Sequence, residues 1–339
     1  MNLPEFEHFE PKTLNEACFL LRKYRDRAKV IAGGTDLLNL MRNRLVEVEY
    51  LIDLKRILEL RDLRFDEKKG LVIGSTNTLS ELIHSPLVRE KAPLLIEAAK
   101  SVAAPPLQHM GTIGGNVCLS TRCFFYNQSK FWRSSRPGCF KVGGSICHVV
   151  KNSKQCHSVF QADAACALVA LKAEIKLVDG GEERTLPLAE FYTGKGEYPN
   201  RLRPTEILTE IIIPQEDHSV GSYERLSSRA ALDFPQVGVA AALSYDPERR
   251  IKEVMIVLNA IAPHPIELKA ARGLLIGKKL DENLIEKIAQ FAFETIHPVN
   301  NTGVSPLYRK KMTRVLVGQT LRKSMDSYRE TFKPHSEQS

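Results

Sequence analysis

The first part of the chain alternates between apolar runs at helical spacing and short runs rich in β-branched residues. One apolar run opens with a threonine that has a glutamate three residues later, the pattern of a capped helix start. The expected elements are a helix at 13–24, a strand at 28–34 that ends in two glycines, a helix at 35–44 and a strand at 49–54. This order predicts a small α/β unit with parallel strands, which we assign to residues 1–55.

The middle of the chain predicts an antiparallel sheet with helices. A strand and a helix are expected within 70–85 and a helix at 93–103. Continuous or alternating apolar runs then predict sheet strands at 162–181, 184–192 and 205–214. A proline and several charges at 214–219 interrupt the pattern. We therefore expect a first domain at 1–216, with subdomains 1–55 and 56–216.

The last part of the chain predicts a second α+β domain at 217–330. Its expected strands lie at 237–246 and 252–261, and its expected helices at 266–277, 283–296 and 306–325. The whole chain is thus expected to be of the α+β class.

Composition places this chain among globular proteins. Of its 339 residues 43% are hydrophobic and 26% are charged. No stretch of eighteen apolar residues is present, so we expect no membrane span. The acidic first residues lack the basic and apolar regions of a secretory signal, so we expect a cytoplasmic protein whose thiols stay reduced.

The seven cysteines fall into two groups. Three lie in apolar sequence and are expected to be small buried residues: Cys18, Cys118 and Cys166. Four lie in a stretch rich in glycine, serine and lysine: Cys123, Cys139, Cys147 and Cys156. Four thiolates can hold zinc or an iron–sulfur cluster, and a mixed site with His148 or His157 is also open. The spacing C-x15-C-x7-C-x8-C has none of the close pairs typical of zinc, and it lets separate loops reach a larger cluster.

The net charge of +8 is concentrated around these cysteines. Residues 117–162 contain no acidic residue and seven basic ones: Arg122, Lys130, Arg133, Arg136, Lys141, Lys151 and Lys154. Such a field favours an anion, whether a nucleic acid, an acidic partner or a negatively charged cluster; a solvated basic loop is the simpler alternative. A zinc-stabilised nucleic-acid-binding protein would explain the charge and the thiols.

Two glycine-rich turns are not explained by nucleic-acid binding. Gly33 and Gly34 lie where a strand turns into a helix, and residues 111–116 form a second such turn. Glycines permit close backbone approach, and free N–H groups at a helix start can hold phosphate. Two turns suit a dinucleotide pyrophosphate. The chain has no G-x-G-x-x-G fingerprint after a strand, and residues 273–279 do not complete a P-loop.

With segments 32–37, 112–116 and 205–214 together, the chain resembles the FAD-binding medium subunit of the molybdenum hydroxylase family, which includes xanthine dehydrogenase and carbon monoxide dehydrogenase. Segments 262–280 and 307–316 extend the resemblance to nearly the whole chain. It implies an FAD-binding PCMH-type domain, with parallel and antiparallel subdomains, followed by a C-terminal domain of the CO dehydrogenase flavoprotein type.

The cysteine-rich stretch resembles the insertion that marks the β subunit of 4-hydroxybenzoyl-CoA reductase. The resemblance implies a 4Fe–4S cluster in an insertion at about 120–160, with these ligands: Cys123, Cys139, Cys147 and Cys156.

The family's FAD contacts carry over to two loops and three separate residues. The pyrophosphate loop corresponds to Lys29, Val30, Ile31, Ala32, Gly33, Gly34, Thr35 and Asp36. The second loop corresponds to Thr112, Ile113, Gly114, Gly115 and Asn116. Asp163 matches an aspartate that binds the flavin side chain, although its neighbours depart from the family pattern. Leu208 matches an apolar residue near the isoalloxazine ring, and Arg225 stands where related sequences have lysine.

The resemblance implies an electron-transfer subunit with no catalytic residue of its own. Its partners would be a molybdopterin-binding large subunit and a 2Fe–2S small subunit in a heterohexamer. Reduced ferredoxin would supply electrons for removing the para-hydroxyl of an aromatic CoA thioester, docking on a basic surface with Lys130, Arg133 and Lys141. Alternatives are a different substrate with outward electron flow, as in xanthine dehydrogenase, and a redox-inactive scaffold. Neither nucleic acid nor a membrane is expected as a partner.

Overall fold

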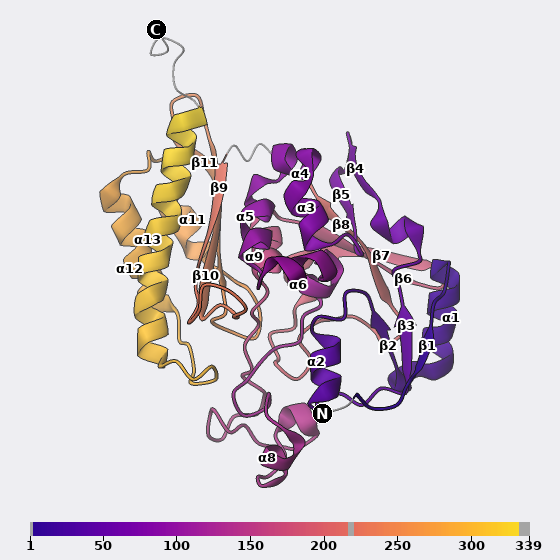
Figure 1. Ribbon diagram of the computed structural model, residues 1–339. Coiled ribbons are helices and arrows are strands. Elements are labelled where there is room, and N and C mark those ends of the chain that lie inside the picture. Colours follow the sequence, from indigo (N-terminus) through magenta and orange to yellow (C-terminus); the bar gives the residue numbers. More distant parts are fainter. Residues whose placement is uncertain (1–2, 216–219, 332–339) are drawn as a thin grey trace.

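Three β-sheets organise the chain in the computed structural model, which describes residues 3–215 and 220–331, with side chains to residue 328 (Figure 1). The first sheet is parallel, with strand order β1-β3-β2. Its strands are β1 (Glu7–Phe9), β2 (Ala28–Ile31) and β3 (Tyr50–Asp53), and its helices are α1 (Leu14–Tyr24), a 3-10 turn at Arg25–Arg27 and α2 (Leu37–Arg42). The predicted parallel α/β unit is confirmed.

The first helix begins where the sequence predicted. The Thr13 hydroxyl accepts a hydrogen bond from the Glu16 N–H at 3.2 Å. The Glu16 carboxylate accepts from the Lys12 N–H at 2.8 Å, one residue before the position a capping box would use. Both bonds satisfy backbone N–H groups that have no partner inside the helix.

The second sheet is antiparallel, with strand order β4-β5-β8-β6-β7. Its strands are β4 (Leu63–Asp66), β5 (Gly70–Gly74), β6 (Glu174–Asp179), β7 (Glu182–Pro187) and β8 (Ile207–Ile213). The helices that accompany it are a 3-10 turn at Leu58–Arg61, α3 (Leu79–His84), α4 (Pro86–Lys91), α5 (Pro93–Ser101), α6 (Pro105–Met110), α7 (Ile113–Val117), α9 (Asp163–Ala170) and α10 (Leu188–Phe191).

The prediction of a strand at the start of 162–181 is wrong, because residues Asp163–Ala170 form helix α9. Every residue of this helix is buried, and it packs against α5, β10 and β11. A segment that is apolar on all sides has no periodicity to distinguish a helix from a strand. Its four alanines favour the helix, since alanine has the highest helix propensity.

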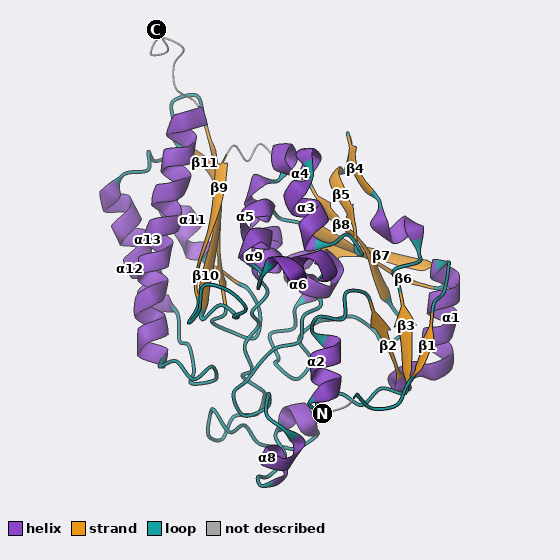
Figure 2. Cartoon of the chain, in the orientation of Figure 1, coloured by secondary structure: helices purple, strands orange, loops and turns teal. Residues whose placement is uncertain are grey.

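The third sheet is antiparallel, with strand order β12-β11-β10-β9. Its strands are β9 (Val220–Leu226), β10 (Val237–Tyr245), β11 (Ile251–Asn259) and β12 (Ile266–Glu267), and its helices are α11 (Lys269–Leu275), α12 (Glu282–Thr295) and α13 (Pro306–Thr331). Helices α12 and α13 cover one face, while α5 and α9 cover the other (Figure 2). This sheet is therefore shared between the cores of the two predicted domains. The predicted boundary at 214–219 falls mainly on 216–219, which lie outside the described residues.

The cysteine-rich stretch consists mostly of loops that extend away from the three sheets (Figure 1). Within it are α8 (Lys130–Ser134) and a 3-10 turn at Phe140–Val142. Its two ends meet: Arg122 and Val159 exchange two backbone hydrogen bonds of 2.7 Å. No helix in the described ranges is long and apolar enough to cross a membrane.

Candidate functional site

A cavity of about 660 Å³ lies where the first two sheets and the C-terminal domain meet. Its size is typical of a small-molecule or cofactor site. Most of the predicted flavin-binding residues line it: Lys29, Val30, Ile31, Ala32, Gly33, Gly34, Thr35, Asp36, Thr112, Gly114, Gly115, Asn116, Asp163 and Leu208.

The two glycine-rich turns are in direct contact along this cavity. A Cβ atom on Gly33 would lie 1.9 Å from the carbonyl oxygen of Met110, so only glycine permits the approach. Gly34 has a φ of +70°, which also favours glycine. Among the described residues, the N–H groups of Gly34 and Thr35 have no hydrogen-bond partner and are available to an anionic ligand. The pair of turns therefore offers close backbone and free N–H donors that could hold a phosphate group.

Asp163 is held at the cavity wall by two donors. The Tyr223 hydroxyl donates to Oδ1 at 2.6 Å, and Arg225 Nη1 donates to Oδ2 at 3.2 Å. Burial raises the pKa of Asp163 to about 6, and the Arg225 charge opposes this shift. The group is thus mostly a carboxylate at neutral pH, with lone pairs left over for a ligand hydroxyl.

Two predicted flavin-binding residues do not line the cavity. Ile113 is fully buried in the core behind the second loop. Arg225 lies behind Asp163 and also donates to the carbonyl of Asp233, so it positions the carboxylate and does not face the cavity.

Sequence reasoning missed several cavity residues. Arg122 lines the cavity, where its guanidinium donates to Asp36 at 2.8 Å and lies 4.1 Å from the ring centroid of Phe234. Leu232, Asp233 and Phe234 come from the loop between β9 and β10. For Arg122, the sequence held one indication of a functional role, its position next to Cys123. The loop between β9 and β10 has no sequence feature that would have indicated its place in the cavity.

A second, much smaller cavity of about 20 Å³ lies in the insertion. All four predicted cluster ligands line it: Cys123, Cys139, Cys147 and Cys156. The void has room for about one water molecule, so an iron–sulfur cluster would require its lining side chains to move outward. The chemistry of the lining fits such a cluster, because four thiols from separate loop segments converge there.

Backbone N–H donors lie beside two of the thiols, and the aromatic residues Phe125, Tyr126 and Phe140 also line their cavity. The Val150 N–H points to the Cys147 sulfur at 3.5 Å, and the Ser158 N–H to the Cys156 sulfur at 3.4 Å. Such donors stabilise bound thiolates and tune cluster potentials. Burial raises the pKa of Cys123 to about 11, so metal binding would have to displace its proton.

Lys141 turns inward, contrary to its predicted place on a docking surface. It lines the cysteine cavity, and its ammonium donates to the carbonyl of Thr121 at 2.6 Å and to the hydroxyl of the same residue at 2.8 Å. Burial lowers the pKa of Lys141 to about 8, while the thiols of Cys156 and Cys123 oppose the shift. Its charge therefore faces the thiols and not a partner.

The two cavities are one residue apart along the chain. Arg122 lines the large cavity and Cys123 lines the small one. The same stretch of backbone therefore contributes to both cavities.

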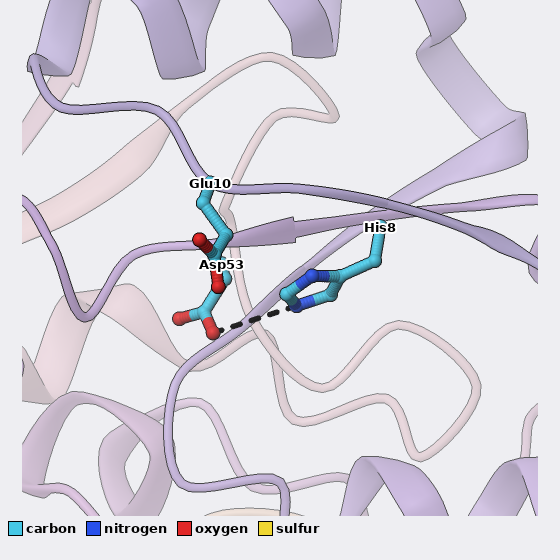
Figure 3. A group of neighbouring side chains, drawn as sticks. All are labelled: His8, Glu10 and Asp53. Carbon is cyan, nitrogen blue, oxygen red and sulfur yellow. Dashed lines mark ion pairs between the residues drawn. The ribbon is translucent and has the colours of Figure 1, made fainter.

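His8, Glu10 and Asp53 form a separate polar group at the edge of the parallel sheet (Figure 3). His8 lies 3.5 Å from the Asp53 carboxylate, which also pairs with Lys55 at 3.0 Å, and Glu10 pairs with Arg56 at 2.9 Å. Because lysine and arginine already balance the two carboxylates, we assign this group a structural role between β1 and β3.

Two family models match the chain and agree with this architecture. The FAD-binding domain of molybdopterin dehydrogenases matches residues 4–216, and the C-terminal domain of CO dehydrogenase flavoproteins matches 222–324. The fold is therefore that of an FAD-binding flavoprotein. The chain belongs to the FAD-binding subunits of the molybdenum hydroxylase family.

Known relatives cover almost the entire chain. The nicotinate dehydrogenase FAD subunit of Eubacterium barkeri is 28% identical over 91% of this chain and 92% of its own length. The aldehyde oxidoreductase FAD-binding subunit PaoB of Escherichia coli is 30% identical over 85% of this chain and 90% of its own. Carbon monoxide dehydrogenase of Hydrogenophaga pseudoflava contains a similar structure, with a TM-score of 0.79, 27% identity and coverage of 96% and 99% of the two chains.

Proposed function

We propose that this chain is an electron-transfer subunit that binds FAD in the large cavity and a 4Fe–4S cluster on Cys123, Cys139, Cys147 and Cys156. The observation that carries the proposal is that these four thiols line one cavity, and that Cys123 directly follows Arg122, which lines the large cavity. When bound, FAD would supply a carrier that can exchange either one or two electrons, and the cluster would exchange electrons singly.

The chain's own residues would bind and orient these groups. The turns at Gly33–Gly34 and 111–116 would hold the pyrophosphate, and Asp163 would accept hydrogen bonds from the flavin side chain. The inward charge of Lys141 would offset the negative charge of a thiolate-bound cluster.

We further propose that the complex resembles 4-hydroxybenzoyl-CoA reductase. Its other members would be a molybdopterin-binding large subunit and a 2Fe–2S small subunit, and it would remove the para-hydroxyl of an aromatic CoA thioester. Support comes from the sequence resemblance of the insertion and from the convergence of its four thiols. The alternative is a molybdenum hydroxylase with another substrate and outward electron flow, and the names of the relatives, as dehydrogenases and an oxidoreductase, favour it.

The test is the metal and flavin content of anaerobically purified protein. We expect about four irons and one FAD per chain, with an EPR signal after dithionite reduction. FAD without iron would refute the cluster while keeping the family. Zinc with neither iron nor flavin, together with salt-dependent nucleic-acid binding, would refute the whole proposal.

The outer surface of the insertion is where we propose that an acidic ferredoxin docks. Phe131 is 89% exposed and follows Lys130, an exposed lysine whose ammonium lies 3.6 Å from the exposed Glu47 carboxylate; the Arg136 guanidinium stacks on Trp132 at 3.7 Å. Exposed aromatic residues ringed by positive charge suit an acidic partner. Two of the basic residues predicted for this surface do not belong to it. Lys141 points inward and donates to Thr121, and Arg133 donates to the carbonyl of Arg44.

Changing Lys130, Lys151 and Lys154 together to glutamine should slow electron transfer from reduced ferredoxin to the assembled complex about tenfold at low salt. The dependence of the rate on salt should also become weaker, because fewer charges steer the encounter. Stopped-flow measurement of flavin reduction gives both quantities. The control changes three exposed lysines elsewhere: Lys68, Lys69 and Lys279. Equal rates and equal salt dependence in the two triple variants would exclude docking at this surface.

A further inference from the structure

Asn301 connects the C-terminal domain to the chain segments that carry two of the four cysteines. It lies in the loop between α12 and α13 and is only 1% exposed. The side-chain amide of Asn301 donates to the backbone carbonyl of His157 at 2.5 Å, and the backbone carbonyl of Asn301 accepts from the Phe124 N–H at 2.8 Å. His157 directly follows Cys156, and Phe124 directly follows Cys123. One residue thus holds the backbone immediately after both buried cysteines.

The orientation of the Asn301 side chain is fixed by Arg309 of α13. The Arg309 guanidinium donates to Asn301 Oδ1 at 3.0 Å, so the amide nitrogen must point toward His157. Arg309 is fully buried and also donates to the carbonyls of Val299, Gln236 and Ala260. Within the described residues, its hydrogen-bond partners include no carboxylate. Its guanidinium donors therefore link α13 to the loop that carries Asn301 and to Gln236 and Ala260, which flank the sheet strands β10 and β11.

The other two cysteines depend on different contacts. Cys139 and Cys147 are half-buried and lie where the insertion bonds to itself, as in the hydrogen bond from the Phe140 N–H to the Ile146 carbonyl. The four thiols therefore divide into an inner pair, Cys123 and Cys156, held from the C-terminal domain, and an outer pair held within the insertion.

We propose that Asn301, oriented by Arg309, is a positioning residue that sets the geometry of Cys123 and Cys156 for cluster binding. The inference rests on the proposed function of the four thiols as cluster ligands. Outer contacts that orient metal ligands typically change metal affinity 10–100-fold when they are removed. The C-terminal domain would then be necessary for the inner half of the site.

The test is Asn301→Asp. Aspartate keeps an oxygen acceptor for Arg309 but places its second oxygen against the His157 carbonyl, where the amide had donated. In protein reconstituted without oxygen we expect iron occupancy at limiting iron to fall about tenfold, while FAD stays at about one per chain. In metal-free protein, maleimide should label Cys123 and Cys156 about tenfold faster, with Cys139 and Cys147 unchanged.

The control is Thr320→Val, which removes a buried hydroxyl from α13 at similar volume and touches neither cysteine segment. It should leave iron, FAD and labelling unchanged. If Asn301→Asp fails to fold, Asn301→Ser removes the carboxamide without adding charge and should change labelling in the same direction. Unchanged labelling of the inner pair in a folded, FAD-containing variant would overturn the proposal. If the wild-type protein binds FAD but no iron, the proposed cluster fails, and the labelling pattern alone decides whether Asn301 positions the inner pair.

Discussion

Replacing Gly33 by alanine should lower the FAD affinity of the chain about 100-fold, which corresponds to about 2.7 kcal/mol. The new Cβ would lie 1.9 Å from the Met110 oxygen, 2.7 Å from the Met110 carbonyl carbon and 2.9 Å from the Gly111 Cα. All three are backbone atoms, so no rotamer change can relieve the overlap and the two turns must separate. Both turns line the large cavity, so the proposed phosphate site would widen. Titration of metal-free apoprotein with FAD, followed by flavin fluorescence, measures the change.

Gly273→Ala is the matched control. Gly273 lies within α11, and a Cβ there would meet no atom within 4 Å. This substitution should leave FAD affinity unchanged and stabilise the helix by about 1 kcal/mol, since alanine is the better helix former. FAD binding by the Gly33→Ala protein at wild-type affinity would show that close contact between the turns is not needed.

Replacing Cys156 by alanine should reduce the iron content well below about four per chain, because the cluster would lose one of its four thiolate ligands. FAD should stay bound, since Cys156 lines the small cavity and not the flavin cavity. Iron analysis and the absorbance of bound flavin, measured on the same anaerobic sample, separate the two effects. Alanine is preferred to serine because a serine oxygen can itself bind iron.

Cys166→Ala provides the control for losing a buried thiol. Cys166 lies in α9, where its thiol donates to the carbonyl of Val257, and it lines neither of the two cavities. The Cys166→Ala protein should retain both iron and FAD. Its free energy of unfolding should fall by about 1 kcal/mol because of the space that the thiol leaves behind. Full iron content in the Cys156→Ala protein would remove this cysteine from the ligand set.

Local features of the chain were predictable from sequence, and contacts between distant segments were not. The strand and turn at 28–36 and the helix start at Thr13 depend on neighbouring residues, so their patterns were sufficient. Helix α9 was missed because a segment buried on every side has no polar face.

The missed site contacts join residues far apart in the chain. Tyr223 bonds to Asp163 across 60 positions, Arg122 to Asp36 across 86, and Asn301 to His157 across 144. Single-sequence patterns report periodicity over a few turns of structure, so they contain no signal for such pairs. The glycine turns and the cysteines were found because their unusual composition marks them without knowledge of their partners.

The two backbone hydrogen bonds between Arg122 and Val159 affect how far the length of the insertion can vary. The two hydrogen bonds close residues 123–158 at their base, as in a hairpin. The entropy of closing a loop rises only slowly with its length, and this base fixes both ends against the flavin-binding framework. The part of this segment that bonds mainly to itself, around Cys139 and Cys147, can therefore differ in length between relatives while the framework keeps its shape.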